Sequence, residues 1–91
     1  MEILYDCKEL EGRALHTWAS QIRGIAKVLN PTEGPSSRAV YRLCDASICV
    51  LSDPGQVWVR IEGDDSDLVE KICTSLNHNY GDQLEELHRS S

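Results

Sequence analysis

Apolar and polar residues alternate in the middle third of the chain, over the segments RAVYRLC, SICVLS and QVWVRIEG. These segments are rich in β-branched residues, and the period of two is typical of strands with one buried face. Pro54 and Gly55 follow the second segment, and their backbone preferences suit a type II turn. The pattern therefore predicts a three-strand antiparallel meander between about residues 38 and 62.

The two turns of this meander determine which residues share a face. A four-residue turn at 53–56 pairs Val50 with Val59, and a two-residue turn at Asp45-Ala46 pairs Tyr41 with Val50. A register slip of one residue at either turn would move half of the apolar residues to the other face. The predicted buried face consists of Ala39, Tyr41, Leu43, Ile48, Val50, Val57, Val59 and Ile61.

Helical spacing of apolar residues flanks the meander on both sides. From about Lys8 the chain places apolar residues four positions apart, which predicts an amphipathic helix: Leu10, Ala14, Trp18 and Ile22. A second helix is predicted after Gly63, with acids in its first turn and a stop at 79–81.

Other segments are less defined by their pattern. Residues 2–7 suit either a short edge strand or an approach to the first helix, and residues 24–29 suit either helix or strand. The proline- and glycine-containing segment 30–37 is predicted to be a mobile loop. Leu84 and Leu87 have the spacing of a last helical turn, and residues 88–91 are predicted to form a frayed tail.

These elements predict one small α+β domain over residues 1–91. Its fold class is a two-layer sandwich in the order helix, three-strand antiparallel meander, helix, with an N-terminal edge strand as an option. The hydrophobic fraction of 41% and the charged fraction of 26% are ordinary for a folded protein. No apolar run approaches the roughly 20 residues of a membrane helix. Because no signal sequence precedes the domain, we expect a cytoplasmic protein with reduced thiols.

The net charge of −6 comes from the last third of the chain. Residues 61–91 contain eight acidic residues, and their only bases are Lys71 and Arg89. A field of this sign repels nucleic acid and favours a basic protein partner. One functional hypothesis is therefore a small acidic inhibitor or regulator, of the phage-antagonist or nucleic-acid-mimic type. Its site would include Asp64, Asp65 and Asp67.

Four cysteines and three histidines prompt a search for metal or thiol chemistry. Structural zinc sites use paired cysteines at tighter spacing than Cys44 and Cys49 show. The chain has no phosphate-binding glycine loop, and no cysteine stands beside a residue that would activate it. We therefore expect no metal, no cofactor and no enzymatic activity, and a redox or metal role of Cys44 and Cys49 stays open.

The second face of the predicted meander provides the leading functional hypothesis. It contains Val40, Arg42, Cys44, Ser47, Cys49, Leu51, Trp58, Arg60 and Glu62. Leu51 and Trp58 are predicted to be direct cross-strand partners, and Cys49 is predicted to lie opposite both Arg42 and Arg60. Tryptophan and arginine dominate the energetics of protein interfaces. We therefore predict a non-catalytic protein-interaction module that uses Trp58, Leu51, Arg42 and Arg60. A homodimer through this face, or burial under the first helix, are the alternatives.

Overall fold

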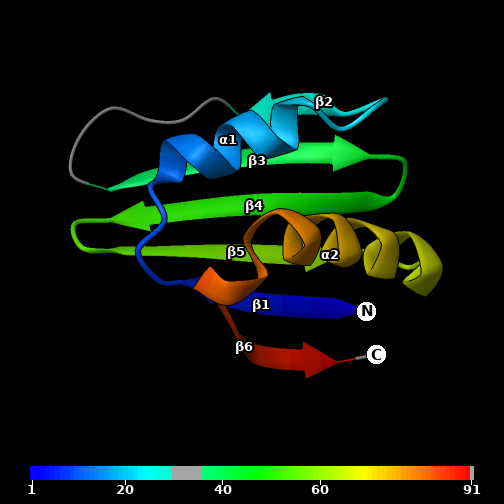
Figure 1. Ribbon diagram of the computed structural model, residues 1–91. Coiled ribbons are helices and arrows are strands. Elements are labelled where there is room, and N and C mark those ends of the chain that lie inside the picture. The colour runs from blue at the N-terminus through cyan, green and yellow to red at the C-terminus, as the bar shows by residue number, and fades with distance from the viewer. Residues whose placement is uncertain (30–35, 91) are drawn as a thin grey trace.

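The computed structural model describes residues 1–29 and 36–90, which form a six-stranded antiparallel sheet with two helices on one of its faces (Figure 1). The elements in chain order are β1 (Glu2–Cys7), α1 (Gly12–Ser20), β2 (Ala26–Leu29), β3 (Ser37–Leu43), β4 (Ala46–Asp53), β5 (Gln56–Glu62), α2 (Ser66–Tyr80), the 3₁₀ helix η1 (Gly81–Gln83) and β6 (Leu84–Ser90). The strand order across the sheet is β2-β3-β4-β5-β1-β6.

The predicted fold class is wrong, because the sheet extends beyond the meander on both sides. Strands β3, β4 and β5 form the predicted meander, but β2 pairs with β3, and β1 and β6 continue the sheet beyond β5. The N-terminal segment is not an edge strand, because β1 lies between β5 and β6. Backbone hydrogen bonding on both sides therefore places this segment inside the sheet.

The register of the meander is correct at one turn and wrong at the other. Strands β4 and β5 pair Val50 with Val59, as predicted. Strands β3 and β4 pair Tyr41 with Ile48, two residues away from the predicted partner Val50. The turn is at Cys44-Asp45, because Cys44 has a φ of 53° in the left-handed region. A shift of two residues leaves every side chain on its predicted face.

Helix α1 is shorter than the apolar spacing predicts. Glu9 has a φ of 61°, so the chain turns before Gly12 and the helix begins only there. Gly24 has a φ of 84°, which directs the chain into β2 after the helix has ended at Ser20. The segment 24–29, which suited either helix or strand, therefore ends in a strand.

Helix α2 forms as predicted and ends at Tyr80. The Asp65 carboxylate accepts hydrogen bonds from the backbone N–H groups of Asp67 and Leu68 at 3.0 and 3.3 Å, which caps the helix. The indole N–H of Trp18 donates to the Ser75 hydroxyl at 3.1 Å and joins the two helices. The buried side chains between sheet and helices include Ile3, Leu15, Tyr41, Ile48, Ile61 and Leu76.

The C-terminal segment is a strand and not the predicted helical turn followed by a tail. After η1, β6 pairs with β1 as far as Ser90, so residues 88–90 belong to the sheet. A register shift opposite Leu4 and Tyr5 interrupts the pairing, which explains why Leu84 and Leu87 do not alternate as in a regular strand. Most of the predicted loop at 30–37 lies outside the described residues, and Ser37 is already the first residue of β3.

Helix α1 packs over β3 and β4, and α2 packs over β5 (Figure 1). Both termini of the described chain lie at the same end of the sheet (Figure 1). Within the described residues 1–29 and 36–90, no helix has the length and apolar character needed to cross a membrane.

Candidate interaction surface

The sheet face opposite the two helices carries no covering element in the described part of the chain (Figure 1). We call it the open face. Directly paired residues of antiparallel strands point to the same side of a sheet. The open face therefore contains three rows that run across the strands from β2 or β3 to β6 and, beside the β4–β5 turn, the pair Asp53 and Gln56.

The pairing of the strands assigns the members of each row. The central row contains Leu29, Val40, Cys49, Arg60, Leu4 and His88. The Trp58 row contains Arg38, Leu51, Trp58, Asp6 and Glu85. The Ser47 row contains Ala26, Arg42, Ser47, Glu62, Glu2 and Ser90.

The structure places Trp58 and Leu51 directly opposite each other, as the sequence predicts. Arg60 lies two residues further along β5, opposite Cys49. The predicted pairing of Arg42 with Cys49 is wrong, because the turn at Cys44-Asp45 pairs Arg42 with Ser47 instead. Trp58, Leu51 and Arg60 are half-buried and Arg42 is exposed, so all four reach the solvent.

Cys49 is the one buried residue of the open face within the described chain. Its exposed fraction is 5%, yet it does not belong to the core cluster between sheet and helices. Its direct neighbours across the strands are Val40 and Arg60. Neighbouring side chains of the open face therefore bury the Cys49 thiol, and no helix of the described chain contributes to this burial.

The Arg60 guanidinium contains a donor without an acceptor. Its Nε atom is excluded from solvent and has no hydrogen-bond partner among the described residues. A buried donor left unpaired costs about 1–3 kcal/mol, more where the group is charged.

The charges at the two sides of the open face differ in sign. The bases Arg38 and Arg42 lie on β3 and the acids Glu2 and Asp6 lie on β1, whereas β5 between them carries both Arg60 and Glu62. Within residues 1–29 and 36–90 these four side chains of β1 and β3 form no ion pair. Glu85, at the β6 edge, is bound by Lys8 at 2.7 Å.

The acidic residues predicted as a second site lie around the start of α2. Asp65 is occupied structurally, because its carboxylate caps the helix and its N–H donates to Asp45 Oδ2 at 3.2 Å. Asp64 lines a shallow hollow with Arg42 and other residues of the Ser47 row, whereas Asp67 does not. The acidic-inhibitor hypothesis stays a prediction. Of its three carboxylates, that of Asp65 already caps α2.

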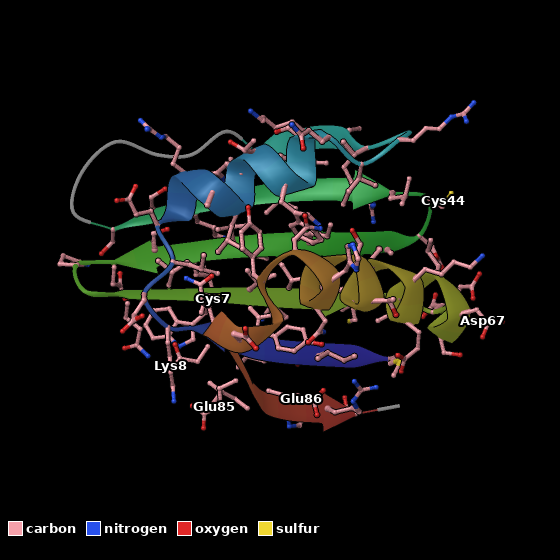
Figure 2. The ribbon with its side chains drawn as sticks, viewed as in Figure 1. Cys7, Lys8, Cys44, Asp67, Glu85 and Glu86 are labelled. Atoms are coloured by element: carbon pink, nitrogen blue, oxygen red, sulfur yellow. The ribbon has the colours of Figure 1, made fainter. Side chains whose placement is uncertain are left out.

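The cysteines are spread over the molecule. Cys44 is exposed at the β3–β4 turn, Cys49 lies in the middle of the open face, and Cys7 lies at the opposite end of the sheet from Cys44 (Figure 2). Burial raises the pKa of the Cys7 thiol to about 12, with a smaller contribution from Asp6. The described residues contain no group of three or more histidine, cysteine or acidic side chains placed to hold a metal ion.

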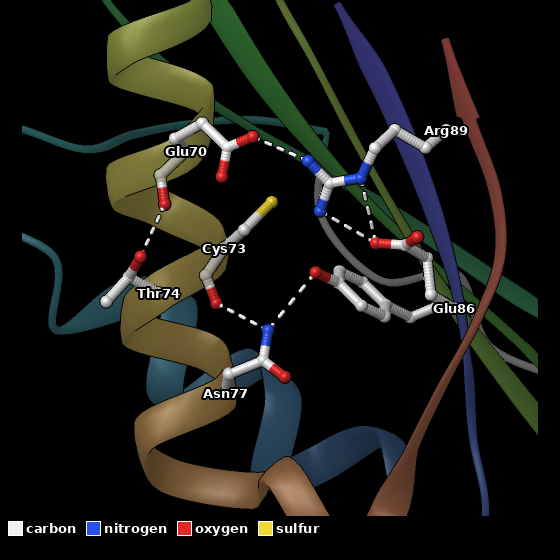
Figure 3. A network of polar contacts seen from close by, with 7 residues as sticks. Glu70, Cys73, Thr74, Asn77, Glu86 and Arg89 are labelled. Atoms are coloured by element: carbon white, nitrogen blue, oxygen red, sulfur yellow. Dashed lines mark hydrogen bonds and ion pairs between the residues drawn. The ribbon is translucent and has the colours of Figure 1, made fainter.

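A polar network connects α2 to β1 and β6 on the helix side of the sheet (Figure 3). Arg89 of β6 binds both Glu70 of α2 and Glu86, and the Asn77 amide donates to the Tyr5 hydroxyl at 3.1 Å. Burial is the main cause that raises the pKa of Tyr5 to about 12, and burial also raises the pKa of Cys73. Both groups are therefore neutral at pH 7, and the network holds β6 in place.

Sequence reasoning missed the part of the open face that β1 and β6 contribute. Leu4 and Asp6 lie beside Arg60 and Trp58, and Glu2 lies beside Glu62. The signal was present as the alternation of Glu2, Leu4 and Asp6 with buried Ile3, Tyr5 and Cys7. Six residues at the start of a chain are too few to decide between a strand and an approach to a helix.

No protein-family model, curated protein or solved structure matches this chain. The open face is therefore interpreted from its geometry alone.

Proposed function

We propose that this protein is a non-catalytic interaction module whose open face binds a protein partner. The observation that carries the proposal is the position of both helices on one side of the sheet, which leaves Trp58, Leu51, Val40 and Leu4 without a covering element in the described chain. Apolar area of this kind, surrounded by charged residues, is typical of interaction surfaces.

The composition at the centre of this face supports the proposal. Trp58 and Arg60 are of the two residue types most enriched among interface residues that dominate binding energy. They are two positions apart on β5, so both side chains point to the same side of the sheet. Trp58 and Arg60 are half-buried, so part of each side chain is accessible to a partner.

The buried thiols support a non-catalytic function. A cysteine nucleophile acts as the thiolate, and burial raises the pKa of Cys7 and of Cys73, which favours the unreactive thiol form. Binding is therefore the function that this geometry supports best.

The proposal is tested by site-specific photo-crosslinking followed by affinity measurement. A benzophenone amino acid is placed at Leu51 on the open face and, as the matched control, at exposed Lys71 on α2. The crosslinked partner is identified, purified and titrated against wild type, Trp58→Ala and Lys71→Ala. Circular dichroism establishes that each variant is folded.

We expect crosslinks from position 51 and not from position 71. Trp58→Ala should raise the Kd by about 30-fold or more, since a dominant interface residue contributes at least about 2 kcal/mol. Lys71→Ala should leave the Kd unchanged. A folded Trp58→Ala chain that binds as tightly as wild type, or crosslinks that form only from position 71, would overturn the proposal.

A further inference from the structure

Several charged and apolar residues of the open face are arranged so that each row is partly complementary to its own reverse. The sheet has six strands, so its midline runs between β4 and β5. In the Trp58 row, Arg38 lies as far from this midline as Asp6, on the other side. In the Ser47 row, Arg42 and Glu2 have the same relationship.

The apolar residues follow the same rule. Val40 on β3 and Leu4 on β1 are equally distant from the midline in the central row, and Leu51 and Trp58 flank the midline directly. At these positions an apolar residue is mirrored by an apolar residue and a base by an acid. Elsewhere the rows do not follow the rule, because Arg60 is mirrored by Cys49, Glu62 by Ser47 and Leu29 by His88.

We infer that the partner of the open face is a second copy of this chain, bound face to face around a two-fold axis that runs parallel to the strands between β4 and β5. This inference rests on the proposed function, because it names the partner of the same surface. A two-fold interface is isologous, so each contact between two different residues occurs twice. Arg38 lies opposite Asp6 of the second copy, and Arg42 lies opposite Glu2 of the second copy.

Beside the axis this interface contains apolar contacts together with Arg60 and Glu62 of β5, and the charged residues of β1 and β3 lie on its two sides. Trp58 packs against Leu51 of the second copy near the axis, and Val40 packs against Leu4 of the second copy. Arg60 lies opposite Cys49 of the second copy, and Glu62 lies opposite Ser47 of the second copy.

The alternative two-fold axis, perpendicular to the strands, is disfavoured by the same charges. It would place each strand over its own copy, with Arg38 against Arg42 and Glu2 against Asp6. Like charges in direct opposition cost several kcal/mol at an interface. The charge pattern therefore selects one of the two face-to-face arrangements.

The size of the face suits a weak dimer. Strand spacing of about 4.8 Å and a rise of about 3.4 Å per residue give the open face dimensions on the order of 25 by 20 Å. Two such faces bury roughly 1,000 Å², which is near the lower limit for a specific interface. Aligned sheets pack about 10 Å apart at a small angle, which is compatible with opposed rows. We expect an association that depends on protein concentration.

The test is charge exchange, measured by sedimentation velocity at low ionic strength with wild type, Arg38→Asp, Asp6→Arg, the double variant, and a mixture of the two single variants. Arg38→Asp alone places aspartate opposite Asp6 twice, and Asp6→Arg alone places arginine opposite Arg38 twice. Each should raise the dimer Kd by about tenfold or more. In the mixture, a heterodimer regains both opposite-charge contacts, and the double variant regains them in a homodimer.

We expect association to be lost in each single variant and recovered both in the mixture and in the double variant. Circular dichroism and thermal unfolding establish that the variants are folded. The inference is overturned if wild type remains monomeric up to about millimolar concentration, a Kd of that size corresponding to a binding free energy of only about −4 kcal/mol. It is also overturned if Arg38→Asp strengthens association, which would indicate the perpendicular axis.

The failures of the two proposals are distinguishable. A monomeric wild type that still crosslinks a different protein from position 51 removes the dimer and keeps the interaction module. If the partner crosslinked from position 51 is a second copy of the chain and its association is insensitive to Trp58→Ala, both proposals are removed.

Discussion

His16 Nδ1 of α1 lies 3.0 Å from the Tyr41 hydroxyl at the centre of β3. Tyr41 has no solvent exposure, and its ring is approached from the β2 side by Lys27, whose Nζ lies 5.7 Å from the ring centroid. The pair thus joins the helix layer to the sheet through a buried phenol. Which group donates depends on the tautomer of the imidazole.

This pair makes stability depend on pH. Burial, and to a lesser extent the charge of Lys27, lowers the pKa of His16 from its usual 6.5. Protonation of His16 therefore favours the unfolded chain. The contribution of neutral His16 is fully present above pH 6.5 and is lost as the pH falls from 6.5 through the lower pKa of the folded state. We expect the free energy of unfolding, measured in urea, to decrease from pH 7.5 to pH 5.5.

The substitution His16→Gln should reduce this pH dependence, because glutamine does not titrate. His78→Gln on the exposed side of α2 serves as the control and should retain it. An identical decrease in wild type and His16→Gln would assign the effect to other groups.

The cap of α2 gives a second prediction. Because the Asp65 carboxylate satisfies two backbone donors at the helix start, Asp65→Ala should lower the free energy of unfolding by about 1 kcal/mol. Asp65→Asn retains an acceptor oxygen and should recover most of the loss. Asp64→Ala is the matched control, since Asp64 accepts no hydrogen bond within the described chain. Equal losses at positions 64 and 65 would point to the charge of the segment as the cause.

The success at the β4–β5 turn and the failure at the β3–β4 turn have a common physical origin. Pro54 and Gly55 restrict the backbone of the β4–β5 turn, and Gly55 has the expected positive φ of 83°. At the β3–β4 turn the left-handed residue is Cys44, a residue type that rarely adopts this conformation, so the sequence contains no signal for this turn. Trp58 and Leu51 were therefore paired correctly, and Arg42 was not.

The missed strands have physical reasons of their own. The register shift in β6 disrupts the period-two pattern, and the remaining Leu84–Leu87 spacing resembles a helical turn. All four residues of β2 are exposed, so no buried alternation marks that strand. The acidic side of the open face depends on where β1 and β6 join the sheet, and that is a tertiary relationship.

The two faces of the sheet should respond differently to the same substitution. Val50 and Val40 both lie in the middle of the sheet, but Val50 is fully buried under the helices and Val40 is half-exposed on the open face. Val50→Ala should lower the free energy of unfolding by about 2 kcal/mol, because two methyl groups leave a cavity. Val40→Ala should cost less than about 1 kcal/mol. Urea unfolding of dilute protein compares the two variants, and equal costs would mean that the open face is covered in solution.

The four thiols should differ in their rates of reaction with a disulfide reagent. Cys44 is exposed and should react first, whereas Cys7, Cys49 and Cys73 are buried and should react only on unfolding. Since Arg60 lies directly opposite Cys49, Arg60→Ala should make a second thiol reactive in the folded chain. Arg42→Ala is the control and should not, because Arg42 lies opposite Ser47. The rates are followed by absorbance, with Cys44→Ser to remove the first phase. Protection of Cys49 that survives Arg60→Ala in dilute folded protein would show that something other than the Arg60 side chain covers it.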